Sequence, residues 1–368
     1  MKVKGTPQRS IRLGGDGWSV DIIDQTQLPH AFVMRNLRCV ADAAEAIRLM
    51  RVRGAPLIGA TAAYGLALAM RDAPDDASLA RSCELLAATR PTAVNLRWAL
   101  QRMRTALNRQ VPERRSQTAY TLAAAMCEED VEINRRIGEH GLGLIRGIHQ
   151  RRARDGVLHI LTHCNAGWLA TVDWGTALAP IYQAHDSGLP VHVWVDETRP
   201  RNQGAALTAW ELLAHGIPHD VIVDNAGGHL MQHGLVDLCI TGTDRTTRDG
   251  DVCNKIGTYL KALAAFDNEV PFYVALPSPT IDWSMSGGLA SVPIEERDPS
   301  EVTEVLGLNS TGKLESVRIT PTATTARNFA FDITPARLVT GLITERGICA
   351  ASERGLLSLF PEQGVACA

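Results

Sequence analysis

The stretch VLHILTHCNAG, residues 157–167, decides the fold class. Its first six residues form a short apolar run of strand type, and the polar residues after it indicate a turn. Similar runs occur at 190–195, 220–223, 236–241 and 271–275, and the segments 204–215, 228–233 and 252–266 between them have helical composition. This alternation predicts a parallel sheet with helices on both faces.

The first half of the chain has a different period. Apolar residues recur at helical spacing in 41–50, 55–70, 80–88, 94–107 and 117–150, and only the neighbourhood of 18–23 reads as extended. The polar segment 151–155 marks a boundary. The sequence therefore predicts an α/β protein with a mostly helical N-terminal domain that holds a small sheet, residues 1–150, and a parallel-sheet domain, residues 151–368.

Composition excludes several function classes. The chain has 368 residues, which suggests about two domains at roughly 150 residues each. A net charge of −3 and 5% aromatic residues argue against nucleic-acid and membrane-surface partners. The start of the chain lacks an apolar signal segment, so we expect a cytoplasmic protein whose eight cysteines are free thiols. The uncharged run 54–70 is expected to be a buried helix, not a membrane span.

Cys164 is the leading candidate for a nucleophile or base. In an open parallel sheet, ligands bind beyond the carboxyl ends of the strands, and Cys164 follows the first predicted strand directly. We expect a helix to begin there, and its free amides would lower the pKa of the thiol. The alternative is a small buried thiol that packs against the sheet. His163 and Cys164 alternate in direction along a strand, so the two side chains need not meet.

Asp244 follows the fourth predicted strand and is the candidate general acid. Apolar walls disfavour the charged carboxylate, which raises its pKa and keeps a proton available at neutral pH. The alternative is a helix N-cap or a partner for Arg245.

Further residues have the chemistry to hold a small anion or a sugar. Arg53-Gly54-Ala55-Pro56 opens a helix whose free amides, with Arg53 beside them, suit a phosphate, although a plain helix start is the alternative. Additional candidates are Arg90 as a second cation, Lys255 beside Asn254 at the start of the helix after the fourth strand, and Gln203 for sugar hydroxyls. The chain contains no Walker loop, no correctly spaced GxGxxG, no CxxC and no HExxH, so we expect neither a nucleotide cofactor nor a metal.

Several long strings resemble one known family. They are VRGAPLIG (52–59), RPTAVNLRWAL (90–100), ILTHCNAG (160–167), DETRPRNQGAALTAWEL (196–212), GTDRTTRDGDVCNKIGTYLKALA (242–264), PFYVALPSPTID (271–282), PIEER (293–297) and FAFDITPARLVTGLITERG (329–347). From about residue 18 to 350 the chain is similar to methylthioribose-1-phosphate isomerases. That superfamily also includes regulatory subunits of the exchange complex of a translation initiation factor.

The resemblance implies a cofactor-free aldose–ketose isomerase of methionine salvage that acts on a sugar phosphate. It also implies a Rossmann-like second domain and a homodimer. The family's catalytic cysteine matches Cys164, and its acid/base aspartate matches Asp244. The matched substrate-binding positions are Arg53, Gly54, Ala55, Arg90, Gln203, Asn254 and Lys255.

Departures from the family pattern leave the substrate's 5-substituent open. They are Ala170-Thr171-Val172-Asp173-Trp174, Thr246-Thr247-Arg248-Asp249 and Asn328-Phe329-Ala330. The alternative substrate is 5-deoxyribose 1-phosphate, whereas no extra cationic cluster favours ribose 1,5-bisphosphate. A non-catalytic regulatory subunit is the alternative from another class, but such a protein need not keep the cysteine, the aspartate and the phosphate-binding set together.

Overall fold

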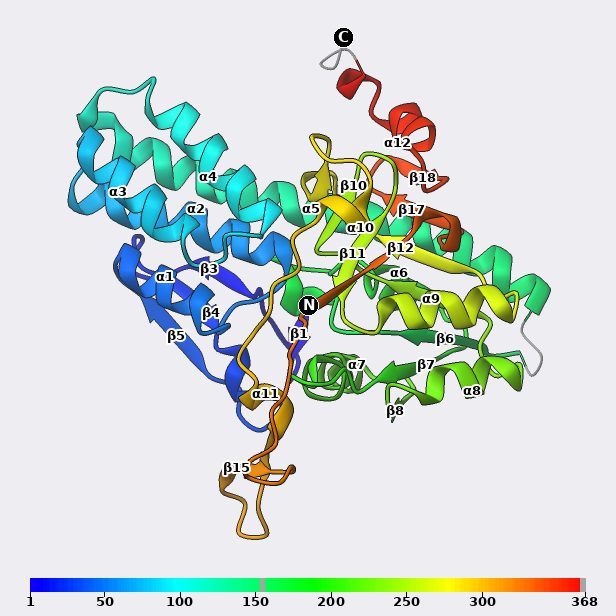
Figure 1. Cartoon of the computed structure of the whole chain (residues 1–368). Coiled ribbons are helices and arrows are strands. Elements are labelled where there is room, and N and C mark those ends of the chain that lie inside the picture. Colours follow the sequence, from blue (N-terminus) through cyan, green and yellow to red (C-terminus); the bar gives the residue numbers. More distant parts are fainter. Residues whose placement is uncertain (153–155, 365–368) are drawn as a thin grey trace.

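The computed structural model describes residues 1–152 and 156–364, and it confirms an α/β protein with a helical N-terminal part (Figure 1). The helices of that part are α1 (Val40–Arg48), α2 (Ala55–Asp72), α3 (Asp76–Ala87), α4 (Val94–Leu107) and α5 (Pro112–Arg152). Helix α2 lies in the middle, packed by α1, α3, α4 and α5. Its glycines admit close neighbours, since a Cβ on Gly59 would lie 3.1 Å from the Asn95 carbonyl oxygen. The prediction of a buried helix there is confirmed.

Short strands complete the N-terminal part. An antiparallel sheet in the order β3-β4-β5 joins β3 (Ile11–Leu13), β4 (Val20–Ile23) and β5 (Met34–Leu37), as the extended pattern at 18–23 predicted. β1 (Lys2–Val3) pairs with β2 (Thr6–Pro7), and a 3₁₀ turn, η1, spans Gln25–Gln27. Within the described residues we find no helix that is long and apolar enough to cross a membrane.

The main sheet has the strand order β18-β17-β12-β9-β6-β7-β8. Its strands are β6 (Leu158–Thr162), β7 (Val191–Asp196), β8 (His219–Ile222), β9 (Leu238–Thr241), β12 (Phe272–Ala275), β17 (Gly341–Thr344) and β18 (Gly347–Cys349). All pairs are parallel except β17 with β18. The five strands predicted from the sequence are confirmed, whereas the β17–β18 pair was not predicted.

Helices cover both faces of this sheet, because neighbouring strand residues point to opposite sides. Ile160 and Ile240 belong to a core shared with α5 and α6, whereas Leu161 and Cys239 belong to a second core with α8 and α9. The helices are α6 (Ala179–Asp186), α7 (Ala209–His215) after a π-helical turn η3 (Gly204–Thr208), α8 (Ala226–Gln232), α9 (Thr258–Asp267) and α12 (Glu353–Leu359).

A second, smaller sheet corrects the prediction of a helix over 252–266. Only its later part is helical, as α9, whereas residues 252–255 form β11. The order is β13-β10-β11-β16, with β10 (Arg245–Thr247), β11 (Val252–Lys255), β13 (Ile281–Asp282) and β16 (Phe331–Thr334). β11 is extended because it pairs with β10 and with β16, far away in the sequence.

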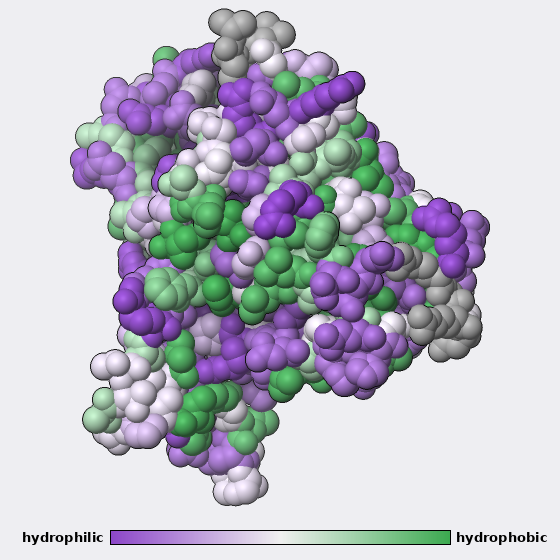
Figure 2. Space-filling model, turned by 45° about the vertical axis from the view of Figure 1, so that its right-hand side comes forward, coloured by the Kyte–Doolittle hydropathy of each residue, from purple (hydrophilic) through white to green (hydrophobic). Residues whose placement is uncertain are grey.

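The remaining elements are short. They are η2 (Trp168–Ala170), η4 (Ser278–Thr280), η5 (Ala336–Leu338), η6 (Pro361–Gln363), α10 (Gly288–Ser291), α11 (Ser300–Thr303), β14 (Glu304–Leu308) and β15 (Leu314–Arg318). β14 and β15 form the hairpin at the bottom of Figure 1, which exposes Leu306 and Val317. Figure 2 shows hydrophilic and hydrophobic residues interspersed over the visible face.

Helix α5 connects the two parts. It packs against α2 on one side and against α6 and β17 on the other. It begins before the predicted segment 117–150 and continues to Arg152, so part of the predicted boundary at 151–155 is helical, and residues 153–155 lie outside the described residues.

The seven cysteines in the described ranges are free thiols, whereas Cys367 lies outside them.

Candidate active site

Cys164 lies at the carboxyl end of β6, and its side chain is 6% exposed. Its backbone is left-handed, with φ +66°. Two threonines hold this geometry: Thr198 Oγ1 accepts a hydrogen bond from the Cys164 amide at 2.9 Å, and Thr208 Oγ1 donates to its carbonyl at 2.8 Å. Such strain in a residue other than glycine persists only where its surroundings impose it.

The predicted helix start at Cys164 is wrong, and so is the expected low thiol pKa. The chain first makes the 3₁₀ turn η2, and α6 begins only at Ala179. Burial raises the pKa of the Cys164 thiol, and the nearby charges of Arg53 and Lys255 offset that effect only in part. Cys164 is therefore a protonated thiol at neutral pH in the free protein.

Asp244 follows β9 and contributes to the same cavity as Cys164. Burial raises the pKa of its carboxyl, against the opposing influence of Lys255 and Arg53, so the direction predicted for a general acid is confirmed. The alternative role as a partner of Arg245 is wrong, because Arg245 lies 3.5 Å from Asp282 and donates to the Thr92 carbonyl at 2.6 Å.

The start of α2 contributes backbone amides and a cation. Gly54 has φ +94°, and a Cβ there would lie 2.4 Å from the Ala170 carbonyl oxygen, so this tight approach requires glycine. Ala55 begins the helix, where the first amides have no partner within the helix. The Arg53 guanidinium donates to the side-chain and backbone oxygens of Asn165, which fixes its direction beside those amides.

Lys255 is a buried cation on β11, not the start of a helix as predicted. Its side chain is 5% exposed, and its ammonium lies 4.7 Å from the centre of the Phe331 ring. Within the described ranges, no carboxylate lies within 4.0 Å of the ammonium, and burial lowers its pKa. Its neighbour Asn254 is also buried and donates to Thr258 Oγ1 at 3.0 Å. An unpaired buried ammonium is suited to receive an anion.

Arg90 and Gln203 enter the same cavity from opposite halves of the chain. Arg90 already pairs with Glu295 at 2.9 Å, so part of its charge is neutralised before any ligand binds. The side-chain oxygen of Gln203 is buried and has no hydrogen-bond partner among the described residues. That oxygen can accept a hydrogen bond from a sugar hydroxyl.

All nine residues predicted for the site meet at two adjoining cavities. One is lined by all of them except Asn254, and the other adds Asn254 and shares Cys164 and Asp244 with the first. The structure thus brings the whole set together, while their individual roles stay predictions. Sequence reasoning missed the apolar wall of Met50, Ile58 and Phe331, because apolar side chains carry no signal of a pocket.

Known proteins of similar length identify the family. The initiation factor 2 subunit family matches residues 51–351. The methylthioribose-1-phosphate isomerase of Rhodospirillum rubrum is 64% identical over 370 residues, covering 100% of this chain and 95% of that protein. The one of Acidiphilium cryptum is 65% identical over 366 residues and covers 99% of both. The chain belongs to the methylthioribose-1-phosphate isomerase family.

Solved structures agree. A 5-methylthioribose 1-phosphate isomerase from Pyrococcus horikoshii superposes with a TM-score of 0.82 at 38% identity, covering 98% of this chain and 100% of that one. A protein of A. fulgidus described as translation initiation factor eIF-2B subunit delta gives 0.78 at 39% identity, covering 96% of this chain and 100% of that one. The resemblance read from the sequence and the fold class it implied are therefore confirmed, and this family of aldose–ketose isomerases acts on a small sugar phosphate.

A buried glutamate that was not predicted supports residues of the candidate site. Glu211 on α7 accepts hydrogen bonds at 3.0 Å from Asn165 Nδ2 and from the amides of Trp168 and Leu169, and another from the Tyr182 hydroxyl. It thereby fixes the loop after Cys164 and orients the side chain that holds Arg53. Glu211 lies within the quoted string 196–212, where one acidic residue in an otherwise apolar helical stretch was the available signal.

Proposed function

We propose that the protein converts 5-methylthioribose 1-phosphate into 5-methylthioribulose 1-phosphate, with Asp244 as the acid and Cys164 at the carbon that loses hydrogen. The observation that carries this proposal is that both side chains line one cavity together with several cations, Arg53 and Lys255 among them. The family membership supports the reaction, and the geometry supports the division of roles.

The phosphate sits at the anomeric carbon, so the sugar ring cannot open by simple hemiacetal exchange. We assign the phosphate to Lys255, Arg53 and the first amides of α2. Lys255 is buried without a carboxylate partner, the first amides have no partner within the helix, and Asn165 holds the Arg53 guanidinium beside them. Burial raises the pKa of Asp244 and so favours its protonated form, which donates its proton to the ring oxygen as the C1–O4 bond breaks. The Gln203 oxygen accepts from a sugar hydroxyl.

A hydrogen must then move from C2 to C1, by one of two routes. In an enediol route, Cys164 removes the C2 proton as a thiolate and the proton returns at C1. Burial raises the pKa of that thiol, so this route requires Cys164 to lose its proton before it acts. In a direct hydride shift the hydrogen passes from C2 to C1, and the C2 hydroxyl loses its proton to the Asp244 carboxylate that ring opening has left; Cys164 then has a positioning role. Complete loss of C2-deuterium from the product would exclude the direct shift.

The apolar wall bears on the 5-substituent. Met50, Ile58 and Phe331 line the cavity and suit a methylthio group, which buries more apolar surface than a methyl group. The deciding experiment compares kcat/KM for 5-methylthioribose 1-phosphate and 5-deoxyribose 1-phosphate. A preference of at least about tenfold for the methylthio substrate, roughly 1.4 kcal/mol, supports the proposal, whereas the reverse preference assigns the alternative substrate.

We also propose a cytoplasmic homodimer built from the domains 1–150 and 151–368. The family membership supports a dimer, and light scattering on the purified protein measures its mass. A non-catalytic regulatory subunit is disfavoured because Cys164, Asp244 and the cations are all in place. Purified protein that turns over neither sugar phosphate would favour that role instead.

A further inference from the structure

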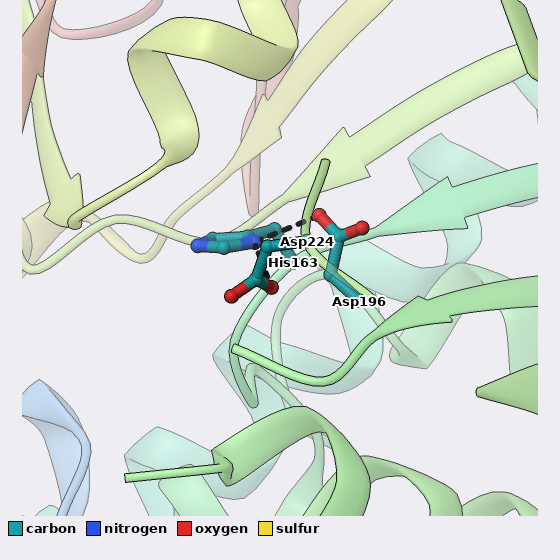
Figure 3. A group of neighbouring side chains, drawn as sticks. All are labelled: His163, Asp196 and Asp224. Atoms are coloured by element: carbon teal, nitrogen blue, oxygen red, sulfur yellow. Dashed lines mark hydrogen bonds and ion pairs between the residues drawn. The ribbon is translucent and has the colours of Figure 1, made fainter. Parts of the chain in front are cut away.

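A buried polar cluster adjoins the site, and one of its members, His163, lines the second of the two cavities beside Cys164. Figure 3 shows His163 with Asp196 and Asp224 pointing toward its ring. Nδ1 of His163 lies 2.8 Å from Asp196 Oδ2 and 3.9 Å from Asp224 Oδ1. The His163 and Asp196 side chains are fully buried. None of these residues contributes to the catalytic roles assigned above.

The charges of this cluster are balanced within the protein. The Lys261 ammonium lies 3.4 Å from Asp196 Oδ2 and donates to the Asp224 carbonyl. The Asp224 carboxylate accepts from the Thr198 and Arg199 amides at 2.7 and 2.8 Å. A lysine thus already occupies the place where a bound cation would compensate the carboxylates. We therefore assign the cluster a structural role and propose no metal ion there.

The second ring nitrogen of His163 makes the cluster more than an ion pair. Nε2 lies 2.8 Å from the carbonyl oxygen of Ile256. A carbonyl oxygen only accepts, so Nε2 must carry a proton and donate it. On the other side of the ring, a single proton shared between Nδ1 and Asp196 satisfies the 2.8 Å contact. The ring is therefore held at both ends.

The hydrogen bond between His163 and Ile256 joins two different segments of the active site. His163 immediately precedes Cys164, and Ile256 immediately follows Lys255. Gly257 makes the close approach possible, because a Cβ there would lie 3.0 Å from the ring. The ring thus ties the end of β6 to the end of β11, and Asp196 anchors it to the end of β7.

We propose that His163 is a positioning residue that sets the place of Lys255 relative to Cys164. The proposal rests on the proposed function, since it assigns those two residues to the isomerase site. Lys255 is one of the two cations that offset the raised pKa of the Cys164 thiol. When the bridge to Ile256 is lost, β11 keeps its pairing with β16 but loses its tie to the end of β6. The place of Lys255 relative to Cys164 is then less tightly set, and the thiol becomes harder to deprotonate and less well placed.

Two substitutions of similar size separate positioning from simple stability. In His163→Gln the amide nitrogen reaches the place of Nε2 and keeps the bond to Ile256, whereas in His163→Asn it reaches only the place of Nδ1 and keeps the bond to Asp196. We expect kcat/KM to fall about 100-fold in His163→Asn and about tenfold or less in His163→Gln. His192→Gln is the matched control, because His192 makes a similar pair with Asp220, at 3.0 Å, near the opposite end of β7. Its activity should stay within about twofold of wild type.

A second readout does not depend on activity. Alkylation of Cys164 is followed against pH by mass spectrometry of the peptide that contains it. Its midpoint should move upward in His163→Asn and return toward wild type in His163→Gln. Equal midpoints in wild type and both variants, or activity losses that merely follow the loss of thermal stability, would overturn the proposal. If wild type isomerises neither substrate, the proposed function fails while the alkylation series still tests the bridge.

If neither variant folds, the wild-type protein supplies the test. In protein labelled with ¹⁵N-histidine, a bridging ring keeps a slowly exchanging Nε2–H signal from about pH 6 to 9, since a buried donor to a carbonyl does not exchange freely. If the ring N–H protons of all eleven histidines exchange rapidly over this pH range, the proposal is overturned.

Discussion

Replacing Lys255 by methionine should move stability and activity in opposite directions. The ammonium is buried beside Phe331, and none of the described carboxylates pairs with it. Replacing a buried ion pair by apolar side chains of similar volume is often neutral or stabilises a protein by about 1–4 kcal/mol, and an unpaired ammonium has no partner charge to repay its desolvation. The loss of the cation–π contact with Phe331 offsets about 1–2 kcal/mol of that stabilisation. We therefore expect a net gain in unfolding free energy of about 1 kcal/mol.

The predicted gain in stability of Lys255→Met should depend on pH. Burial lowers the pKa of Lys255, so the unfolded chain binds this proton more tightly than the folded chain. Stability of the wild-type protein therefore rises with pH between the lowered pKa and the ordinary value of 10.5. The advantage of Lys255→Met should be largest below that window and shrink as pH rises through it.

Activity should fall because the substrate phosphate loses a buried charged donor. Truncating one partner of such a pair costs about 2–5 kcal/mol. At about 1.4 kcal/mol per factor of ten, kcat/KM should drop roughly 30- to 5,000-fold. Steady-state kinetics with 5-methylthioribose 1-phosphate measures this loss, and denaturant unfolding measures the gain in stability.

The matched control is Lys261→Met, which removes the other buried lysine. Lys261 lies 3.4 Å from Asp196, so its loss removes the cation that compensates the carboxylates of the cluster around His163 and should cost about 3–5 kcal/mol. A Lys255→Met protein that is destabilised as much as Lys261→Met, or that keeps wild-type kcat/KM, would refute the assignment of Lys255 as an unpaired cation that awaits an anion.

Three further predictions follow from the same contacts. Gly54→Ala should cost about 1–3 kcal/mol and displace the start of α2, because its Cβ would lie 2.4 Å from the Ala170 carbonyl oxygen; circular dichroism melts and kcat/KM report both effects. In a pH–rate profile, kcat/KM should decline as pH rises past the raised pKa of Asp244, since the proton donor is lost, and a profile without that decline contradicts an acid role. Glu211→Gln should lower the unfolding free energy by about 1–3 kcal/mol and raise KM, because the new amide group would face hydrogen-bond donors and no longer hold Asn165. Unchanged unfolding free energy and KM would contradict the role of Glu211 in holding the loop after Cys164.

Much of the fold was predictable because local pattern and final structure agree. Helix α4 spans Val94–Leu107, the predicted range, and β6, β7, β8, β9 and β12 all lie within a residue or two of their predicted runs. In these segments the apolar period matches the face that is buried. The two cores on opposite sides of the sheet then follow from alternation, as in Ile160 and Leu161.

The failures have physical causes. Residues 252–255 contain one β-branched side chain and precede a true helix, so nothing local marks β11; its pairing with the distant strand β16 decides its conformation. The low pKa expected for Cys164 assumed a helix start that the chain does not make. Burial, which a sequence does not display, instead dominates the pKa of that thiol.

The composition of the site was predictable residue by residue, but its electrostatics were not. Spacing and resemblance placed Asp244 and Lys255 in one site. Only the structure distinguishes Arg90, which already pairs with Glu295, from Lys255, whose ammonium has no carboxylate within 4.0 Å in the described part of the chain. That difference determines which cation is left for the phosphate.

The most direct test of the central claim is kcat/KM for 5-methylthioribose 1-phosphate in wild type, Cys164→Ser and Asp244→Asn. Both substitutions keep the size of the side chain and remove its chemistry. We predict that each lowers kcat/KM by roughly 10²–10⁴-fold in a protein with wild-type thermal stability. Turnover at the wild-type rate in both variants would contradict the assignment of these two side chains as the catalytic pair.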